Sequence, residues 1–277
     1  MFDFFVIITR RERNMKNRID KEMYERLLVP SRSKAQELIN LGVVFCNDKK
    51  IDKANFLVNK EDKITIKDNK LLKYVSRGGL KLAKALDYFN INVENLIAMD
   101  IGSSTGGFCD CLIQNGIKKV IAIDVGRNLL HDNLKNNKLI ELHEETNFKE
   151  IESSYFKDID IITCDVSFIS IKAIIEKIFR ENIKVEGIFL IKPQFECGKE
   201  LAYKYKGIIL NKQVHIKIIK ELFKYFNSLD FYIKDFTFSP ISGGDGNIEY
   251  LVYLSNKIST NKKINIESIV QEGFRSK

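Results

Sequence analysis

Between residues 74 and 255 the apolar residues form short continuous runs, separated by stretches with helical spacing. The runs are bounded by turn-forming residues and are typical of strands buried on both faces: LIAMDIG (96–102), KKVIAIDVG (118–126), LIELHEE (139–145), IDIITCDVS (159–167) and GIFLIKP (187–193). Residues 171–179 and 212–229 instead place apolar side chains on one face of a helix. This alternation predicts a mostly parallel sheet with helices on both sides, which is an α/β fold.

The end of this region has a different pattern. FYIKDFTFSP (231–240) and NIEYLVYL (247–254) are two strand-like runs joined by a glycine-rich loop, with no helix between them. We therefore expect a C-terminal antiparallel hairpin to close the sheet.

Residues 16–73 form a smaller unit with its own pattern. Helical spacing in NRIDKEMYERLLV (17–29) precedes SRSKAQELINLG (31–42), where Ser31 or Ser33 is available as the N-cap. Two short β-like runs follow, VVFC (43–46) and KITIK (63–67). The pattern predicts a small α+β domain.

The domain boundaries follow from these patterns. We expect a small domain at 16–73, a large one at 74–255, a poorly ordered extension at 1–15, and a C-terminal tail at 256–277 whose structure the pattern does not assign. No apolar stretch approaches the roughly 20 residues that a spanning helix needs, so we expect a protein without a membrane span.

Charge and cysteine content refine this picture. The 277 residues carry a formal charge of +8, of which residues 1–75 supply 17 Lys/Arg against 11 Asp/Glu. A basic front end indicates an anionic partner, with nucleic acid as the leading candidate and a solubilising surface as the alternative. The five cysteines form no C-x-x-C pair, and the three histidines are scattered. We expect no disulfide frame and no metal, in a reduced, cytoplasmic protein.

A glycine-rich turn follows the first predicted strand, in DIGSSTGGF (100–108). Glycine lacks the Cβ that would keep a ligand away from the backbone. Asp124 ends the next strand, where an acid accepts hydrogen bonds from ribose hydroxyls. The spacing is not G-x-G-x-x-G, which disfavours a dinucleotide.

Four charged residues are expected at one edge of the sheet. Asp165 and Lys192 each end a parallel strand, Lys81 opens a helix in SRGGLKL (76–82), and Glu249 opens the last, antiparallel strand. Ligands bind at the carboxyl ends of parallel strands, which predicts a reactive cluster there. A surface network of salt bridges is the alternative.

The front unit resembles the S4-type RNA-binding domain. The resemblance rests on R-x-D at 18–20 and on SRSKAQELI-x-x-G-x-V with the hairpin after it. It implies docking on structured RNA through shape and phosphates. Arg18, Arg32 and Lys34 are the expected RNA contacts of this unit, and Arg77, before the glycine pair 78–79, is expected to contact the RNA backbone.

D-I-G-x-x-x-G-G with an acid on the second strand looks like the S-adenosylmethionine site of Rossmann-like methyltransferases. The resemblance implies S-adenosyl-L-methionine as the cofactor. The residues expected to bind it are Asp100, Gly102, Ser103, Ser104, Thr105, Gly106, Gly107, Phe108, Asp124, Val125, Asn147 and Asp165.

The set Lys81, Asp165, Lys192 and Glu249 resembles the catalytic tetrad of FtsJ-type ribose 2′-O-methyltransferases. With the front unit and the runs CDVSFIS, KPQFE and SGGDGNIE, the chain is similar to the TlyA family, also called hemolysin-like, from about residue 15 to 254. That resemblance implies a cytidine 2′-O-methyltransferase acting on 16S and/or 23S rRNA, with ribosomal subunits as partners.

Two points stay open from the sequence. Lys192 is expected to touch the ribose hydroxyl either as a neutral general base or as a cation that stabilises the incipient alkoxide, because burial and neighbouring acids oppose each other. The alternative functions are a membrane-lytic protein, which lacks the expected amphipathic or spanning segment, and a non-catalytic RNA-binding factor with a vestigial cofactor fold.

Overall fold

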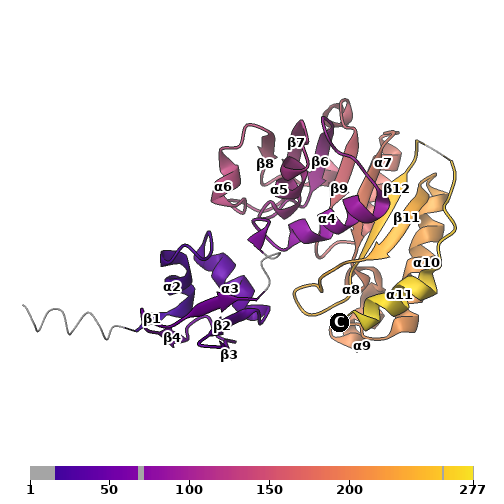
Figure 1. The fold of residues 1–277 in the computed structure, drawn as a ribbon. Helices are drawn as coiled ribbons and strands as arrows, with labels where there is room; N and C mark the ends of the chain where they lie inside the picture. The colour runs from indigo at the N-terminus through magenta and orange to yellow at the C-terminus, as the bar shows by residue number, and fades with distance from the viewer. Residues whose placement is uncertain (1–15, 68–71, 258, 277) are drawn as a thin grey trace, which may run out of the picture. The chain divides into compact units, whose positions relative to one another are not determined.

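The computed structural model describes residues 16–67, 72–257 and 259–276 (Figure 1). The chain divides into two compact units, a front unit that ends at Ser76 and a second unit that begins at Arg77. The predicted extension at 1–15 lies outside the described residues. Each unit is described by itself below.

The front unit combines helices with very short strands. Its elements are β1 (Asn17–Arg18), α2 (Ile19–Glu25), α3 (Arg32–Asn40), β2 (Val44–Cys46), β3 (Lys49–Lys50), β4 (Leu57–Val58) and β5 (Ile64–Ile66). Strand β2 pairs antiparallel with both β3 and β5, so the two β-like runs of the sequence lie side by side. The α+β prediction for this unit is confirmed.

Local sequence sets the ends of its helices. Ser31 is the N-cap of α3 and accepts a hydrogen bond from the Lys34 N–H at 3.1 Å, which satisfies one unpaired donor of the first turn. Gly42 follows the helix with φ +69°, a conformation that glycine adopts without steric cost. Helix α2 is shorter than the pattern suggested, because the chain turns at Leu27, whose φ is 57°.

The second unit alternates strands and helices along the chain. Its elements are α4 (Gly78–Phe89), β6 (Ile97–Ile101), α5 (Gly107–Gln114), β7 (Lys119–Ile123), α6 (Asp132–Lys135), β8 (Ile140–His143), β9 (Ile161–Cys164), α7 (Ile171–Arg180), β10 (Glu186–Ile191), α8 (Pro193–Glu196), α9 (Gly198–Tyr205), α10 (Lys212–Ser228), β11 (Tyr232–Phe238), β12 (Tyr250–Ser255) and α11 (Ile266–Arg275). Two 3₁₀ turns, η2 (Phe148–Glu150) and η3 (Ser153–Phe156), follow β8.

Seven strands form one sheet in the order β11-β12-β10-β9-β6-β7-β8. Strand β12 runs antiparallel to both of its neighbours, β10 and β11, and the remaining pairs are parallel. The predicted parallel sheet with a C-terminal antiparallel hairpin is therefore confirmed. The order reverses direction between β6 and β9, the position where open α/β sheets bind ligands.

The strands alternate their side chains between two helical layers. Phe189 of β10 is fully buried in a core that includes Ile175 of α7 and Leu222 of α10. Helix α4 lies against α5 and contacts β11 and β12. Both faces of the sheet are thus covered, which explains why the strands are continuous apolar runs.

The C-terminal tail adds a helix to this unit. In α11, Val270 is fully buried and Ile266 nearly so, both in the same core as α10. A Cβ at Gly273 would lie 3.1 Å from Cβ of Phe238 in β11, so the glycine allows close packing. The tail, unassigned by the sequence pattern, is part of the packed unit.

Candidate active site

The turn between β6 and α5 needs glycine. Gly102 has φ +80°, and a Cβ there would come within 2.9 Å of the Asp165 carbonyl oxygen. Gly106 has φ +86° and is the N-cap of α5. The first glycine lets the chain after β6 approach the chain after β9, at the point where the strand order reverses.

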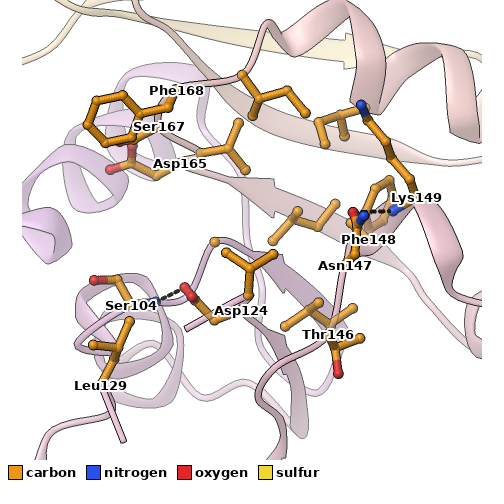
Figure 2. A pocket seen from close by; sticks show the side chains of 17 residues that line it. Ser104, Asp124, Leu129, Thr146, Asn147, Phe148, Lys149, Asp165, Ser167 and Phe168 are labelled. Atoms are coloured by element: carbon orange, nitrogen blue, oxygen red, sulfur yellow. Dashed lines mark hydrogen bonds between the residues drawn. The ribbon is translucent and has the colours of Figure 1, made fainter. Parts of the chain in front are cut away.

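Asp124 joins this turn to the end of β7. Its Oδ2 accepts the Ser104 N–H at 2.7 Å (Figure 2), and its Oδ1 accepts the Gly126 N–H at 2.7 Å. A carboxylate oxygen has more than one acceptor site, so each oxygen keeps capacity for a ligand hydroxyl. The side chain therefore fits the role of ribose acceptor.

A cavity of about 350 Å³ opens at the carboxyl ends of β6, β7 and β9. Figure 2 shows Ser104 and Asp124 on one side of it and Asp165, Ser167 and Phe168 on another. Its lining is mostly apolar with a few polar groups: Ile101, Gly102, Ser104, Ile123, Asp124, Val125, Leu129, Thr146, Asn147, Phe148, Lys149, Asp165, Val166, Ser167, Phe168, Ile169 and Ile174. Cavities of this size and character hold small molecules and cofactors.

The cavity includes only part of the predicted cofactor set. Gly102, Ser104, Asp124, Val125, Asn147 and Asp165 line it, whereas Asp100, Ser103, Thr105, Gly106, Gly107 and Phe108 do not. Three further lining residues were not predicted from the sequence: Leu129, Thr146 and Phe148. Residues 166–169 also line the cavity, and their position directly after a predicted strand, in the run CDVSFIS, is the sequence feature that indicates it.

Asp100 lies beneath the turn and does not reach the cavity. It is 1% exposed, and it accepts hydrogen bonds from Oγ1 of Thr163 at 2.8 Å and from Sγ of Cys109 at 3.2 Å. Burial away from any cation raises its pKa to about 7, although the two hydrogen bonds oppose the shift. In this structure Asp100 supports the turn from below.

The four predicted charges converge at the edge of this cavity. Lys81 Nζ lies 2.7 Å from Glu249 Oε2 and 3.1 Å from Asp165 Oδ2, and Lys192 Nζ lies 2.6 Å from Asp165 Oδ1. The side chains of Lys81 and Lys192 are each 8% exposed. Asp165 therefore sits between two lysines, which excludes the alternative of a solvated surface network.

Ser167 completes the surroundings of Lys192. The ammonium donates a hydrogen bond to Ser167 Oγ at 2.8 Å as well as pairing with Asp165. An ammonium carries three N–H donors, so these two partners leave one donor for another ligand. Both Asp165 and Ser167 line the cavity.

Burial and charge act in opposite directions on this cluster. Burial alone would raise the pKa of Asp165, but the ammonium groups of Lys81 and Lys192 outweigh it and lower that pKa. Burial alone would lower the pKa of Lys81, but the carboxylates of Asp165 and Glu249 raise it. Asp165 is therefore ionised and Lys81 protonated at neutral pH.

A glycine-rich loop covers Glu249. A Cβ on Gly243 would lie 2.6 Å from Glu249 Oε1, so a larger residue would collide with the carboxylate. The guanidinium of Arg77 lies beside the same loop, 3.6 Å from the position of a Cβ on Gly244. The loop and the start of α4 thus bring Arg77 and Lys81 to the same side of the fold.

The predicted RNA contacts of the front unit have different surroundings. Arg18 and Arg32 both donate to the buried carboxylate of Asp20 at 3.0 Å, and their side chains remain about half exposed. Lys34 is 2% exposed, and its ammonium pairs with Glu37 at 3.3 Å. The two arginines face solvent, whereas Lys34 is packed inside the unit.

Two features are absent from the part of the chain that the structure describes. No group of three or more His, Cys, Asp or Glu side chains there is arranged to hold a metal ion. No helix within these residues has the length and apolar content needed to cross a membrane.

Comparison with known proteins identifies the family of each unit. The model of the FtsJ-like methyltransferase family matches residues 74–256, and the S4 domain model matches residues 17–64. The chain belongs to the FtsJ-like methyltransferase family. It carries an S4 domain in front, as the sequence resemblance implied.

Relatives cover most of the chain. A "23S rRNA (cytidine-2'-O)-methyltransferase TlyA" of Campylobacter jejuni is 38% identical over 80% of this chain and 93% of its own length. "Hemolysin A" of Brachyspira hyodysenteriae is 42% identical over 85% of this chain and 98% of its own length. The solved structure of a hemolysin-like protein from Streptococcus thermophilus is 34% identical, with a TM-score of 0.73, and the match covers 94% of this chain and 96% of that one.

Proposed function

We propose that this FtsJ-like methyltransferase uses S-adenosyl-L-methionine to methylate the ribose 2′-hydroxyl of a cytidine in ribosomal RNA. The observation that carries the proposal is the cluster Lys81, Asp165, Lys192 and Glu249 at the edge of a cavity beside a glycine turn. The TlyA relative supports the choice of cytidine in rRNA. We propose the cytoplasm, with its ribosomal subunits, as the site of action.

The cavity has the groups that the cofactor requires. When bound, S-adenosylmethionine supplies an electrophilic methyl group on a sulfonium. Asp124 would accept hydrogen bonds from ribose hydroxyls, and Val125, Leu129 and Phe148 would supply apolar contacts for a base. Gly102 keeps the backbone open beside them.

Lys192 is proposed to act on the ribose hydroxyl. Its ammonium is held by Asp165 and Ser167, with one N–H left to donate to the 2′-oxygen. S-Adenosylmethionine would supply the methyl group and leave as a neutral thioether; the hydroxyl proton would pass to water, and the ammonium of Lys192 would stabilise the charge developing on oxygen. Fixing the hydroxyl in line with the methyl contributes further, because orientation alone is worth several kcal/mol.

Asp165 and Lys81 hold Lys192 in place. Asp165 is ionised between the two lysines, and Lys81 is fixed in turn by Glu249. In the front unit, Arg18 and Arg32 are proposed to contact RNA phosphates with their exposed edges, and Arg77 to contact the RNA backbone beside the site.

The test is transfer of tritiated methyl groups from S-adenosylmethionine to separated ribosomal subunits from a strain that lacks the modification. We expect one subunit or both to be labelled at a cytidine 2′-oxygen, mapped by resistance of the neighbouring linkage to alkaline hydrolysis. The Lys192→Ala variant should bind the cofactor in calorimetry but lose at least ~10³-fold in turnover, as expected when a group stabilising the transition state is removed.

A matched control is Lys177→Ala. Lys177 is also in an ion pair, with Glu181 just after α7, and its side chain is 16% exposed, but it lies outside the cavity. It should transfer methyl groups normally. Label on a base instead of a ribose, or full turnover by Lys192→Ala, would refute the proposed chemistry.

A further inference from the structure

The segment that follows α8 buries a single residue, Ile209, in the packed core. It comprises α9 and the residues that lead into α10, and we call residues 198–212 the exposed arm. Helix α9 contains no buried residue, which is unusual for a helix in a globular domain. Tyr203 is 89% exposed, and Leu210 beyond the helix is 63% exposed. Its composition therefore serves something other than the core of this unit.

The arm is nevertheless anchored near both ends. Just before it, Glu196 accepts hydrogen bonds from the Ser170 hydroxyl at 2.6 Å and from the Ile171 N–H at 2.8 Å. Near its far end, the buried side chain of Asn247 donates to the Gly207 carbonyl at 2.8 Å and accepts from the Ile209 N–H at 3.0 Å. These contacts pin the arm to the loops that follow β9 and precede β12.

Those loops also carry the reactive cluster. Asn247 lies two residues before Glu249, and Glu196 lies four residues after Lys192. Both therefore belong to the carboxyl edge of the sheet, where the cavity opens. The anchors hold the arm beside the active site rather than at a distance from it.

The lysines of the arm are unpaired. It contains Lys199, Lys204, Lys206 and Lys212 with Glu200 as its single acid, and none of the four lysines forms an ion pair within the described part of the chain. Three exposed lysines elsewhere in the unit, in contrast, pair with carboxylates: Lys119 with Glu141, Lys135 with Asp132, and Lys217 with Glu221. The arm thus presents a local excess of positive charge.

We infer that the exposed arm is a second RNA-contacting surface, in which Lys204 and Lys206 contact phosphates and Tyr203 stacks on an unpaired base near the target nucleotide. This inference rests on the proposed function. Unpaired lysines attract phosphates, and an exposed aromatic ring adds stacking that is tolerant of base identity. A surface with both, fixed next to the reactive groups, suits the flanking single-stranded RNA of a ribose methyltransferase.

The charge component is tested with two double variants of equal charge. Lys204→Ala/Lys206→Ala changes the arm, whereas Lys118→Ala/Lys138→Ala removes two exposed, unpaired lysines that precede β7 and β8, at the opposite edge of the sheet. Affinity for purified ribosomal subunits is measured by filter binding over a range of salt concentrations. We expect the arm variant to bind several-fold more weakly and to reduce the salt slope by about two, and the control to change neither.

The stacking component is tested at Tyr203. We expect Tyr203→Ala to raise the KM for ribosomal subunits about tenfold, within the range by which one base–aromatic stack contributes to binding. Tyr203→Phe keeps the ring and should restore the wild-type KM. Calorimetry with S-adenosylmethionine should give the same affinity for all of these variants, because none of the changed residues lines the cavity.

The outcomes separate this inference from the proposed function. If the wild type binds subunits but transfers no methyl group, the proposed function fails and the binding data still decide the role of the arm. Equal RNA affinity for the arm variant and its control would overturn the inference. So would arm-dependent binding to phosphatidylglycerol vesicles with unchanged RNA affinity, since the basic and apolar arm would then serve a lipid surface.

Discussion

Two largely buried aspartates, one in each unit, are held in nearly the same way and serve different ends. Asp20 of the front unit accepts hydrogen bonds from Arg18, Arg32 and Gln36, and Asp165 pairs with two lysines. Both carboxyls have a pKa below the usual range, because the nearby cations outweigh the effect of burial. The local electrostatics alone do not distinguish the two.

The difference lies in the surroundings of the cations. The arginines around Asp20 are rigid planar donors that remain half exposed, so the carboxylate orients two solvent-facing guanidinium groups. The lysines around Asp165 are buried beside a cavity, and one keeps an unused donor. A carboxylate between two cations thus stabilises the local structure in the front unit and forms part of a reactive site in the second unit.

A third buried aspartate shows what the cations contribute. Asp100 accepts hydrogen bonds from neutral donors, Thr163 and Cys109, and burial raises its pKa to about 7. It lies one strand away from Asp165, which ends β9 next to β6. The sign of the pKa change therefore follows the partners of each carboxyl and not its burial.

The largest expected effect is on turnover and follows from a substitution at Asp165. Asp165→Asn removes the negative charge between Lys81 and Lys192 while keeping the shape of the side chain. We expect turnover to fall about 10²- to 10⁴-fold, the range typical of a positioned proton-transfer or charge-orienting group. Hydrogen exchange in α2 and α3 should not change, because the ion pairs of Asp20 in the front unit are unaffected. A variant with turnover within threefold of the wild type would show that Lys192 does not depend on Asp165.

A smaller effect, on the stability of the front unit, is expected from a substitution at Asp20. Asp20→Asn weakens the charged hydrogen bonds to Arg18 and Arg32, and should destabilise the front unit by about 2 to 3 kcal/mol. Hydrogen exchange of α2 and α3 amides measures this loss. Turnover with saturating ribosomal subunits should stay unchanged, and binding of subunits should weaken because the arginines lose their orientation.

The matched control for Asp20 is Glu25→Gln. Glu25 is 46% exposed and pairs with Lys21 on the surface of the same helix. Such pairs contribute little, so the change should stay below about 0.5 kcal/mol. Equal destabilisation by both variants would contradict the view that the ion pairs of Asp20 stabilise this unit.

The third effect, smaller than that at Asp20 over one pH unit, is a pH dependence at Asp100. Its pKa is about 7 in the folded state and near 4 in an unfolded chain, so the folded state holds one more proton between these values. Stability is therefore highest below pH 4 as far as this group is concerned, and falls by about 1.4 kcal/mol per pH unit as pH rises from 4 to 7. Asp100→Asn should remove this slope.

The measurement is the midpoint of chemical unfolding at pH 5.5 and 6.5 for the wild type and Asp100→Asn. The two proteins differ only at position 100, so contributions from all other groups cancel in the comparison. Identical slopes would mean that Asp100 is ionised in the folded protein despite its burial.

Several features of the fold were accessible from the sequence because they depend on local patterns. The strands at 97–101 and 161–164 were predicted because apolar runs flanked by turn residues describe strands buried on both faces. The edge position of Asp165 and Lys192 followed from parallel strands alone. Periodicity did not predict the end of α2, since the left-handed turn at Leu27 is not a glycine.

The site itself was only partly predictable. The burial of Lys34 against Glu37 was not predictable from the sequence, because a lysine near a helix start is usually solvated. Nor did it distinguish Asp100, which lies under the turn, from Asp124, which lines the cavity, although both end neighbouring strands. Alternate side chains of a strand point to opposite faces, and the twist of the sheet and the loops decides which ones reach a ligand.

What the amino-acid sequence determined by itself is the order of strands and helices, the glycine turn, and the presence of four charged residues at strand and helix ends that share one edge. Only the tertiary structure decided that Asp165 lies between Lys81 and Lys192, that Ser167 shares Lys192, and that helix α9 buries none of its residues. The physical reason is range. Periodicity and turn preferences act within a few residues, whereas an ion pair between positions 81 and 165 forms only when packing brings distant segments together and removes water from between them.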